Sequence, residues 1–285
     1  MKHITSPENA LYKSLLKLAR SSRERRKTRQ ALLDGTHLVG AYCASIGAPQ
    51  TLILSATGLE HEETQSLLRQ MPELKPVVLA DSLFKQISPV TTPTGILAII
   101  EVLERVVKPQ DTRFCVLLEE LQDAGNLGSI LRSAAAAGAD AAFLSKNCAF
   151  AWSPKTLRAA MGAHFQLRLA ENADLVEVAK KFRGKLVAAK PHAKKSLYEV
   201  DLRGPVAFII GNEGAGLSEP LLNLAHHRVN IFMPGKIESL NAAAAAAVCL
   251  FEKVRQEQVN RVLKNSPGAA FDTKNAQMQG ARRRS

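Results

Sequence analysis

The chain has 285 residues, a formal net charge of +12, and a hydrophobic content of 46%. This length allows two domains or one large domain with an ample core, and the hydrophobic content is ordinary for a soluble globular protein. No apolar run has the length of a membrane span, and the polar, charged start does not resemble a signal peptide. We therefore expect neither a membrane-spanning protein nor a secreted one.

The four cysteines are scattered singly along the chain, with no CxxC pair. Such spacing is typical of small buried residues in a reducing compartment, not of disulfides or a zinc site. We therefore expect a cytoplasmic protein that needs no metal. The cysteines are Cys43, Cys115, Cys148 and Cys249.

The positive charge is concentrated at the two ends of the chain. Residues 1–30 carry +7 and residues 266–285 carry +3, which leaves only +2 for the remaining body. A charge run is often a solvated face, but a cluster of this density also binds phosphate backbones through counterion release. Aromatic residues make up only 5% of the chain, which argues against a surface of stacked aromatic side chains as the main means of binding nucleic acid. The candidate nucleic-acid-binding side chains are Lys13, Lys17, Arg20, Arg23, Arg25, Arg26, Lys27 and Arg29.

The first third of the chain predicts a small α/β unit. The apolar residues between Leu11 and Leu18 are spaced as in a helix, and this helix leads into the basic segment. After Asp34 and Gly35, strand-like and helix-like stretches alternate until about Arg105. The Lys108–Pro109 dipeptide lies in a short polar stretch that is typical of a linker. The strands expected in this unit are 51–54, 77–79 and 96–102.

A stronger alternation begins at Phe114 and predicts a mainly parallel sheet covered by helices, which is an α/β fold. The expected strands are 114–118, 142–144, 166–169, 186–188, 206–210 and 229–233. Beyond residue 265 the sequence is polar and small, and we expect it to be disordered. The predicted divisions are a domain at 1–105, a linker at 106–112, a second domain at 113–265, and a basic tail at 266–285.

Three of the predicted strands run into loops that are rich in glycine and small polar residues. The first loop opens a helix, where free backbone amides form a natural anion site. In the third loop, Ser239 is the expected N-cap of a helix that begins with Leu240, Asn241 and six alanines. Three such strand ends in one sheet predict a shared ligand crevice. The stretches read EELQDAGNLGSILR (119–132), VAFIIGNEGAGL (206–217) and VNIFMPGKIESLNAAAAAAVCL (229–250).

Several common site motifs are missing from the sequence. It contains no GxGxxG after a strand, no P-loop, no HExxH and no GxSxG. This disfavours a dinucleotide-dependent enzyme and the usual glycine-rich loop of open-sheet methyltransferases.

In order and spacing, the three stretches resemble the three motifs of the SpoU-type (TrmH-type) RNA 2′-O-ribose methyltransferases of the SPOUT superfamily. The resemblance covers about residues 113–256, and residues 5–100 resemble the N-terminal substrate-binding domain of many members. Departures are small: Ala124 replaces a proline, and Ala242 and Ala243 replace bulkier residues. Because no polar group is lost, we expect an active enzyme. The matching segments are LQDAGNLGSILRSAAAAGA, IIGNEGAGLSEPLL and VNIFMPGKIESLNAAAAAAVCLFE.

The resemblance implies a fold, a reaction and a cofactor. It implies S-adenosylmethionine bound within a deep trefoil knot, and methyl transfer to a ribose 2′-hydroxyl of structured RNA, with ribosomal RNA favoured over transfer RNA. The cofactor-contacting positions that it implies are Gly211, Ile231 and Leu240, with Asn212 and Met233 nearby. The catalytic candidates that it implies are Arg132, Asn126, Ser239, Asn241 and Glu213.

The role of Arg132 stays open at this point. The family places an arginine where the 2′-hydroxyl loses its proton, with Asn126 positioning it or the ribose. Arginine is a reluctant base, because its pKa lies above about 12. The alternative is a clamp on the target phosphate, with His164 and Glu213 as other proton acceptors.

Two further expectations concern partners. A non-catalytic RNA-binding or ribosome-assembly protein with the same fold is the alternative to the enzyme. The helix after Ser239 carries more apolar surface than one face normally needs, with Val248, Leu250, Phe251 and Val254 beyond the alanines. We expect a homodimer to bury this surface, and coverage by the N-terminal domain is the alternative.

Overall fold

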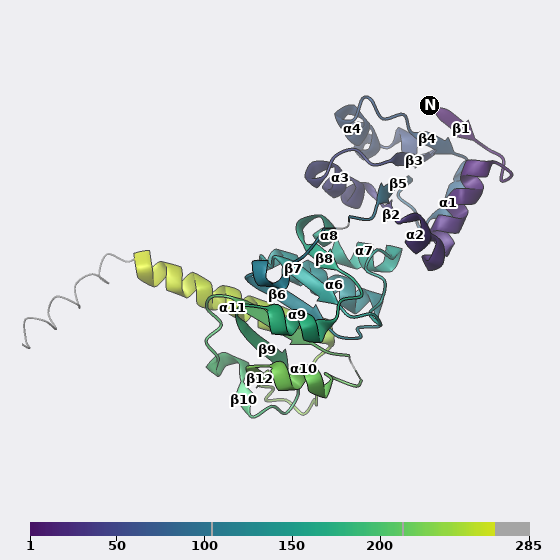
Figure 1. Cartoon of the computed structure of the whole chain (residues 1–285). Coiled ribbons are helices and arrows are strands. Elements are labelled where there is room, and N and C mark those ends of the chain that lie inside the picture. The colour runs from purple at the N-terminus through teal and green to yellow at the C-terminus, as the bar shows by residue number, and fades with distance from the viewer. Residues whose placement is uncertain (104, 213, 266–285) are drawn as a thin grey trace, which may run out of the picture.

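The structure is a computed structural model that describes residues 1–103, 105–212 and 214–265 (Figure 1). Two β-sheets occupy separate parts of the molecule, and the long helix α11 (Ala242–Asn265) extends beyond the second sheet. Our predictions for Glu213 and for the tail at 266–285 lie outside the described residues.

The first sheet has five strands in the order β1-β4-β3-β5-β2. Strands β1, β4 and β3 run parallel, and β5 pairs antiparallel with both β3 and β2. The strands are β1 (Lys2–Ile4), β2 (Gln30–Asp34), β3 (Thr51–Ser55), β4 (Val77–Leu79) and β5 (Ile96–Glu101). The helices are α1 (Ala10–Arg20), α2 (Ser22–Thr28), α3 (Thr36–Ser45), α4 (Glu62–Gln70) and α5 (Asp81–Ile87), with a 3₁₀ turn η1 (Gly58–Glu60).

The N-terminal helices begin where their capping residues predict. The Asn9 side chain accepts hydrogen bonds from the backbone amides of Leu11 and Tyr12, which starts α1. Ser21 caps α2 in the same way, and this short helix ends at Arg29 in the left-handed conformation. The basic segment is therefore two helices joined at a sharp corner.

The second sheet has seven strands in the order β10-β12-β9-β11-β6-β7-β8, and every strand pair is parallel. The predicted α/β fold with a mainly parallel sheet is confirmed. The strands are β6 (Phe114–Leu118), β7 (Ala141–Leu144), β8 (Arg168–Ala170), β9 (Lys185–Ala189), β10 (Lys195–Ser196), β11 (Val206–Ile210) and β12 (His227–Asn230). The other elements are α6 (Ala124–Ala136), α7 (Pro154–Ala160), α8 (Ala163–Gln166), α9 (Leu175–Lys181), α10 (Glu219–Leu224), η2 (Pro109–Asp111) and η3 (Leu197–Glu199).

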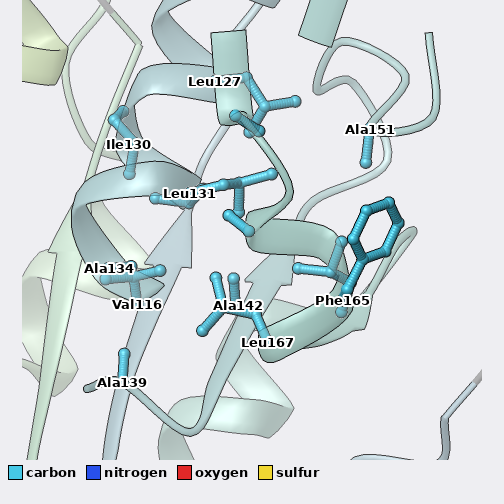
Figure 2. Close-up of a cluster of buried hydrophobic side chains, with 14 of the residues drawn as sticks. Val116, Leu127, Ile130, Leu131, Ala134, Ala139, Ala142, Ala151, Phe165 and Leu167 are labelled. Carbon is cyan, nitrogen blue, oxygen red and sulfur yellow. The ribbon is translucent and has the colours of Figure 1, made fainter. Parts of the chain in front are cut away.

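Strands β6 and β11 form the centre of this sheet, and all of their residues are buried. Helices α6, α7, α8 and α11 pack on one face, and α9 and α10 pack on the other. Figure 2 shows Leu127, Ile130 and Leu131 of α6 among the side chains that fill the core against Val116 and Ala142 of the sheet. Burial on both faces explains why these strands are continuous apolar runs.

The two sheets are joined by a packed interface. The rings of Tyr42 and Phe165 meet edge to face with centroids 5.3 Å apart. Around this contact, Arg158 donates to the carbonyl oxygen of Pro89 at 3.3 Å, and the Gln166 amide donates to the hydroxyl of Ser45 at 3.3 Å. One continuous hydrophobic cluster contains residues of both sheets, so the N-terminal unit has a fixed place on α7 and α8.

Three local predictions were wrong. Strand β12 ends at Asn230 and not at residue 233, because the chain leaves the sheet there to line a cavity. Gln166 belongs to α8 and not to a strand. The cap of α11 is Asn241 and not Ser239, since the Asn241 side chain accepts from the amides of Ala243 and Ala244. None of the helices in the described part of the chain is both long enough and apolar enough to cross a membrane.

Candidate functional site

A cavity of about 720 Å³ lies where three neighbouring strands of the second sheet end. Its walls come from residues 189–192 at the end of β9, from residues 210–212, 214 and 216 at the end of β11, and from residues between 229 and 245 around the end of β12. Because parallel strands share a direction, their carboxyl ends lie at one edge, where α/β proteins bind ligands. A crevice at the strand ends is present, and its volume is within the usual range for small-molecule sites. Its lining includes the second and third of the three predicted stretches, but no residue of the first stretch, 119–132.

The wall after β11 is a tight turn that depends on Gly211. The backbones of Asn212 and Gly216 exchange two hydrogen bonds of 3.0 Å, which folds the chain back on itself. A Cβ atom on Gly211 would lie only 2.3 Å from the carbonyl oxygen of Gly216. Glycine is needed at 211 because two backbone segments touch there. The wall of the cavity at this point is therefore formed by backbone atoms.

Asn212 holds this turn in place with its side chain. Its Oδ1 accepts from the amides of Gly214 and Ala215 at 2.8 and 2.9 Å, and its Nδ2 donates to the carbonyl oxygen of Glu120 at 2.8 Å. The side-chain amide is thus occupied by the loop itself. Asn212 lines the cavity as expected, but it positions the wall and ties it to the end of β6.

The loop after β12 supplies the opposite wall and the mouth of the cavity. Ile231, Met233, Ser239 and Leu240 all line the cavity, as the sequence predicted for a shared site. The large side chains of Phe232 and Ile237 also line it and are 71% and 75% exposed. This loop therefore offers an apolar rim that a bound ligand can cover.

Two asparagines connect the mouth of the cavity to helix α6. The Asn241 Nδ2 donates to Asn126 Oδ1 at 2.9 Å, while the Asn241 Oδ1 caps α11. Asn126 lies in the first turn of α6, where its own amide donates to Asp123 Oδ1 at 2.8 Å. The first and third sequence motifs thus meet through a single polar contact between residues 115 positions apart.

Acidic residues at the end of β6 organise the same edge. Glu120 adopts a left-handed backbone conformation with φ of 52°, and its carboxylate accepts from Asn147 at 2.7 Å. The Glu119 carboxylate accepts from the amide of Ser218 at 2.8 Å. These bonds fasten the loop after β6 to the loops after β7 and β11.

Asp123 stabilises the start of α6 by charge as well as by capping. Lys155, at the start of α7, donates to its Oδ2 at 2.8 Å. This ion pair and the amide of Asn126 lower the pKa of Asp123 below its usual value. The carboxylate is therefore ionised at neutral pH, as a negative charge at a helix N-terminus favours.

Arg132 does not lie in the cavity of its own chain. It is exposed on α6 and is not among the residues that line the cavity. Six residues turn a helix through about 600°, which leaves Arg132 and Asn126 about 120° apart around α6. Within one chain, Arg132 and Asn126 therefore project from different sides of α6.

His164 is unsuited to be a proton acceptor for a substrate. It is buried, its Nε2 lies 2.7 Å from the carbonyl oxygen of Ala151, and its ring packs on Trp152. Burial lowers the pKa of His164 to about 4, so the ring is neutral and its Nε2 donates to that carbonyl. This is the structural role that a lone buried histidine usually has.

The basic segment of α1 and α2 is an exposed cationic surface with one exception. Arg25 is only 6% exposed, and its guanidinium donates to the carbonyl oxygens of Leu18 and Ala19 at 2.7 and 2.9 Å. It therefore closes the corner between the two helices and is set aside from the nucleic-acid candidates. The exposed members are Lys13, Lys17, Arg20, Arg23, Arg26, Lys27 and Arg29.

The wall formed by residues 189–192 was not predicted from the sequence. Lys190 and His192 line the cavity directly after β9. The signal was available, because a strand that ends in Lys-Pro-His at the carboxyl edge follows the same rule as the other loops. Among the residues that the structure describes, no group of three His, Cys, Asp or Glu side chains could hold a metal ion.

Comparisons with known proteins agree with this geometry. Residues 113–251 match the SpoU rRNA Methylase family, and residues 9–98 match the MRM3-like substrate binding domain. The chain is 33% identical to an uncharacterized tRNA/rRNA methyltransferase of Synechocystis, with 89% of this chain and 94% of that protein covered. It is 31% identical to the 23S rRNA guanosine 2′-O-methyltransferase RlmP of Bacillus subtilis, with 88% and 98% covered.

Solved structures share the complete architecture. A crystal structure of an RNA 2′-O ribose methyltransferase superposes with a TM-score of 0.78 at 30% identity, over 90% of this chain and 99% of that one. The SpoU methyltransferase AviRb of Streptomyces viridochromogenes, in complex with the cofactor AdoMet, gives 0.77 at 28% identity, over 88% and 100%. The fold and the strand-end cavity thus define an RNA methyltransferase architecture. The chain belongs to the SpoU rRNA methylase family, as its three motifs predicted.

Asn241 has two roles, because it caps α11 and donates to Asn126. Asn241→Ala should lower the free energy of unfolding by about 1 kcal/mol, because α11 loses its N-cap. Asn241→Asp keeps the capping oxygen but loses the donor to Asn126, so it should retain wild-type stability in urea unfolding. Equal destabilisation by both substitutions would show that the bond to Asn126, and not the cap, supports the helix.

Proposed function

We propose that this protein transfers a methyl group from S-adenosylmethionine to a ribose 2′-hydroxyl of RNA, and that the RNA is ribosomal. The observation that carries the proposal is the cavity, because its walls are the loops that hold the second and third family motifs. Support for ribosomal RNA comes from relatives such as RlmP, a 23S rRNA methyltransferase. S-adenosylmethionine is the cofactor of the related AviRb structure.

The lining residues fit such a cofactor. Ile231, Met233 and Leu240 offer apolar contacts for a purine ring. Around them, the turn at Gly211 brings backbone amides and carbonyls to the surface of the wall. Backbone groups of this kind can read the edge of an adenine without charged side chains, and Ser239 adds a hydroxyl. We assign Ile231, Met233, Leu240 and Gly211 to cofactor binding. Asn212 keeps the turn at Gly211 in position.

The chemistry requires an activated hydroxyl. S-adenosylmethionine supplies a methyl group on a positively charged sulfur, which a nucleophile attacks. A ribose hydroxyl is a poor nucleophile until its proton is being removed, so a base or an orienting group is needed. We assign the orientation of the ribose to the bonded pair of Asn126 and Asn241, with Ser239 beside them at the cavity mouth.

Arg132 is the proposed activating group, either as base or as phosphate clamp. Because it lies outside its own cavity, we propose that it acts at the cavity of a second subunit. Glu213 stays a further candidate outside the described residues.

Arg132→Ala should reduce the single-turnover rate of methyl transfer to unmodified ribosomal RNA by roughly 10² to 10⁴. Cofactor affinity in a calorimetric titration should stay within a few-fold, because Arg132 does not line the cavity. Arg183→Ala, at an exposed arginine after α9, is the matched control and should behave as wild type. A near-wild-type rate for Arg132→Ala would show that Arg132 takes no part in the reaction.

The reaction should also proceed in EDTA, and loss of activity that added metal restores would contradict the metal-free proposal.

The exposed residues of α1 and α2 are the proposed RNA-binding surface. Replacing Lys13, Lys17, Arg23 and Lys27 with alanine should weaken RNA binding. The slope of the logarithm of the binding constant against the logarithm of the salt concentration should become less steep by roughly 0.7 to 0.9 per lost phosphate contact. Arg25→Ala should instead destabilise the corner between the helices, because its partners are backbone carbonyls. An unchanged salt slope in the variant with all four substitutions would show that this surface is only an ordinary solvated face.

A homodimer is part of the proposal. Ala244, Val248 and Phe251 form a stripe along α11, and Phe251 is 47% exposed. Leu250 is buried in its own chain, so the apolar excess is smaller than the sequence suggested. Sedimentation at micromolar concentration should give a dimer for the wild type and a monomer for Phe251→Glu. A wild-type monomer would contradict both the dimer and a shared site.

Three further assignments stay proposals. The family resemblance predicts that the segment around the cavity is threaded as a trefoil knot, and the close approach at Gly211 suits such a passage. The domain boundaries at 1–105, 106–112 and 113–265 also stay predictions. We infer a cytoplasmic location, which the free thiols of the four cysteines support.

A further inference from the structure

The junction between the cationic surface and the second sheet carries a stacked pair of side chains. The guanidinium carbon of Arg26, on α2, lies 4.1 Å from the centroid of the Phe150 ring, which is a cation–π contact. Arg26 is exposed, while its neighbour Arg25 is buried in the helix corner. Within the described residues, no carboxylate forms an ion pair with Arg26. The planar group is thus oriented by the ring and keeps its positive charge.

Phe150 is held firmly by the start of α7. Its carbonyl oxygen accepts from the amide of Ser153 at 3.1 Å and from the hydroxyl of Thr156 at 3.0 Å. The neighbouring Trp152 is buried in the core, whereas Phe150 itself is half-buried. Figure 1 shows α2 beside α7 at this junction. The pair therefore sits on a rigid support and faces solvent.

A short series of contacts leads from the start of α7, which holds Phe150, to the cavity. Lys155 of the same helix start binds Asp123 at 2.8 Å, and Asp123 accepts from the amide of Asn126 at 2.8 Å. Asn126 in turn is bonded to Asn241 at the cavity mouth. The start of α7, which holds Phe150, is thus connected through side-chain contacts to the mouth of the cavity.

We propose that Arg26 and Phe150 form a stacking site for one unpaired base that flanks the target nucleotide of the RNA substrate. This inference rests on the proposed function. Guanidinium planes and aromatic rings both stack on bases, and sequence-specific RNA binding mostly uses unpaired bases of this kind. The helical cationic surface holds the phosphate backbone, and the Arg26–Phe150 pair fixes its register relative to the cavity. A single stacking point agrees with the low aromatic content of the chain.

The alternative role for the pair is to hold the two sheets together. Other contacts already do so, including the packing of Tyr42 on Phe165 and the bond from Arg158 to Pro89. A purely structural pair would affect the binding of all RNA equally. A stacking site discriminates between unpaired and paired bases, and this difference makes the two roles separable.

The test uses the full chain and two fluorescent RNA probes with equal numbers of phosphates. One probe is a hairpin with a single-stranded loop, and the other is a fully paired duplex. Arg26→Lys keeps the charge and loses the plane, and Phe150→Leu keeps the apolar packing and loses the ring. Each should weaken hairpin binding roughly tenfold, with duplex binding and the salt slope unchanged. Arg69→Lys, at an exposed arginine of α4 that lies outside the proposed RNA-binding surface, is the matched control and should bind both probes as wild type does.

Hairpin binding at the wild-type level in both variants would overturn the inference, and so would an equal loss for both probes. Methyl transfer by the wild type and cofactor affinity of the variants are measured in parallel. A wild type that transfers no methyl group to RNA would contradict the proposed function itself. A wild type that does transfer it, with variants that bind both probes normally, would contradict the stacking site alone.

Discussion

All seven strands of the second sheet run in the same direction, and the functional site depends on this constraint. Parallel pairing sends every loop that follows a strand to one edge of the sheet. The chain starts in the middle, at β6, fills one side with β7 and β8, and later fills the other side with β9, β11 and β12. The loops after β9, β11 and β12 therefore meet at this edge, and the cavity lies between them. Residues that are far apart in sequence, such as Asn126 and Asn241, meet at that crevice.

The sheet and its loops are stabilised by different forces. The central strands are held by burial of apolar surface, at roughly 25 cal/mol per Å², and they provide a fixed platform. The loops lie at the surface and are held by side-chain amides, each of whose hydrogen bonds contributes only about 0.5 to 1.5 kcal/mol. Asn212 alone makes three such bonds. A wall built this way is defined in position without a large apolar core beneath it, which suits a site that must admit a ligand.

The N-terminal unit has a fixed orientation relative to this site, because it is packed against α7 and α8. The interface combines aromatic packing at Tyr42 with the stacked pair at Phe150. Its cationic helices consequently have a fixed direction relative to the cavity. In the proposed function, an RNA bound along them would be presented to the cavity at a defined register, which a flexible linker would not provide.

Much of this architecture was predictable from the sequence, and the failures have physical causes. Strands β6 and β11 were placed correctly because burial on both faces leaves an unbroken apolar run. The run at 229–233 looked equally apolar, but Ile231 and Met233 face a cavity, and composition cannot tell a ligand pocket from a core. Strands β1 and β2 were missed because they are short or adjoin the basic helices.

The site was predictable in its residues but less so in its geometry. The second and third motifs contain most of the residues that line the cavity. The burial of Arg25, in contrast, depends on a corner between two helices that charge counting does not show. The separation of Arg132 from Asn126 follows from helical rotation, and this argument was available from spacing alone. The pairing of Asn126 with Asn241 could not be derived, because it joins two loops whose meeting depends on strand order.

The most direct test of the account is the identity of the methylated atom. The purified protein is incubated with S-adenosylmethionine carrying a labelled methyl group and with unmodified ribosomal RNA, and the RNA is then digested to nucleosides for mass spectrometry. The proposed function predicts that the label appears in one 2′-O-methylnucleoside, at one position, with the methyl group on the ribose. A label found on a base, or no transfer by a folded protein that binds both the cofactor and the RNA, would contradict it.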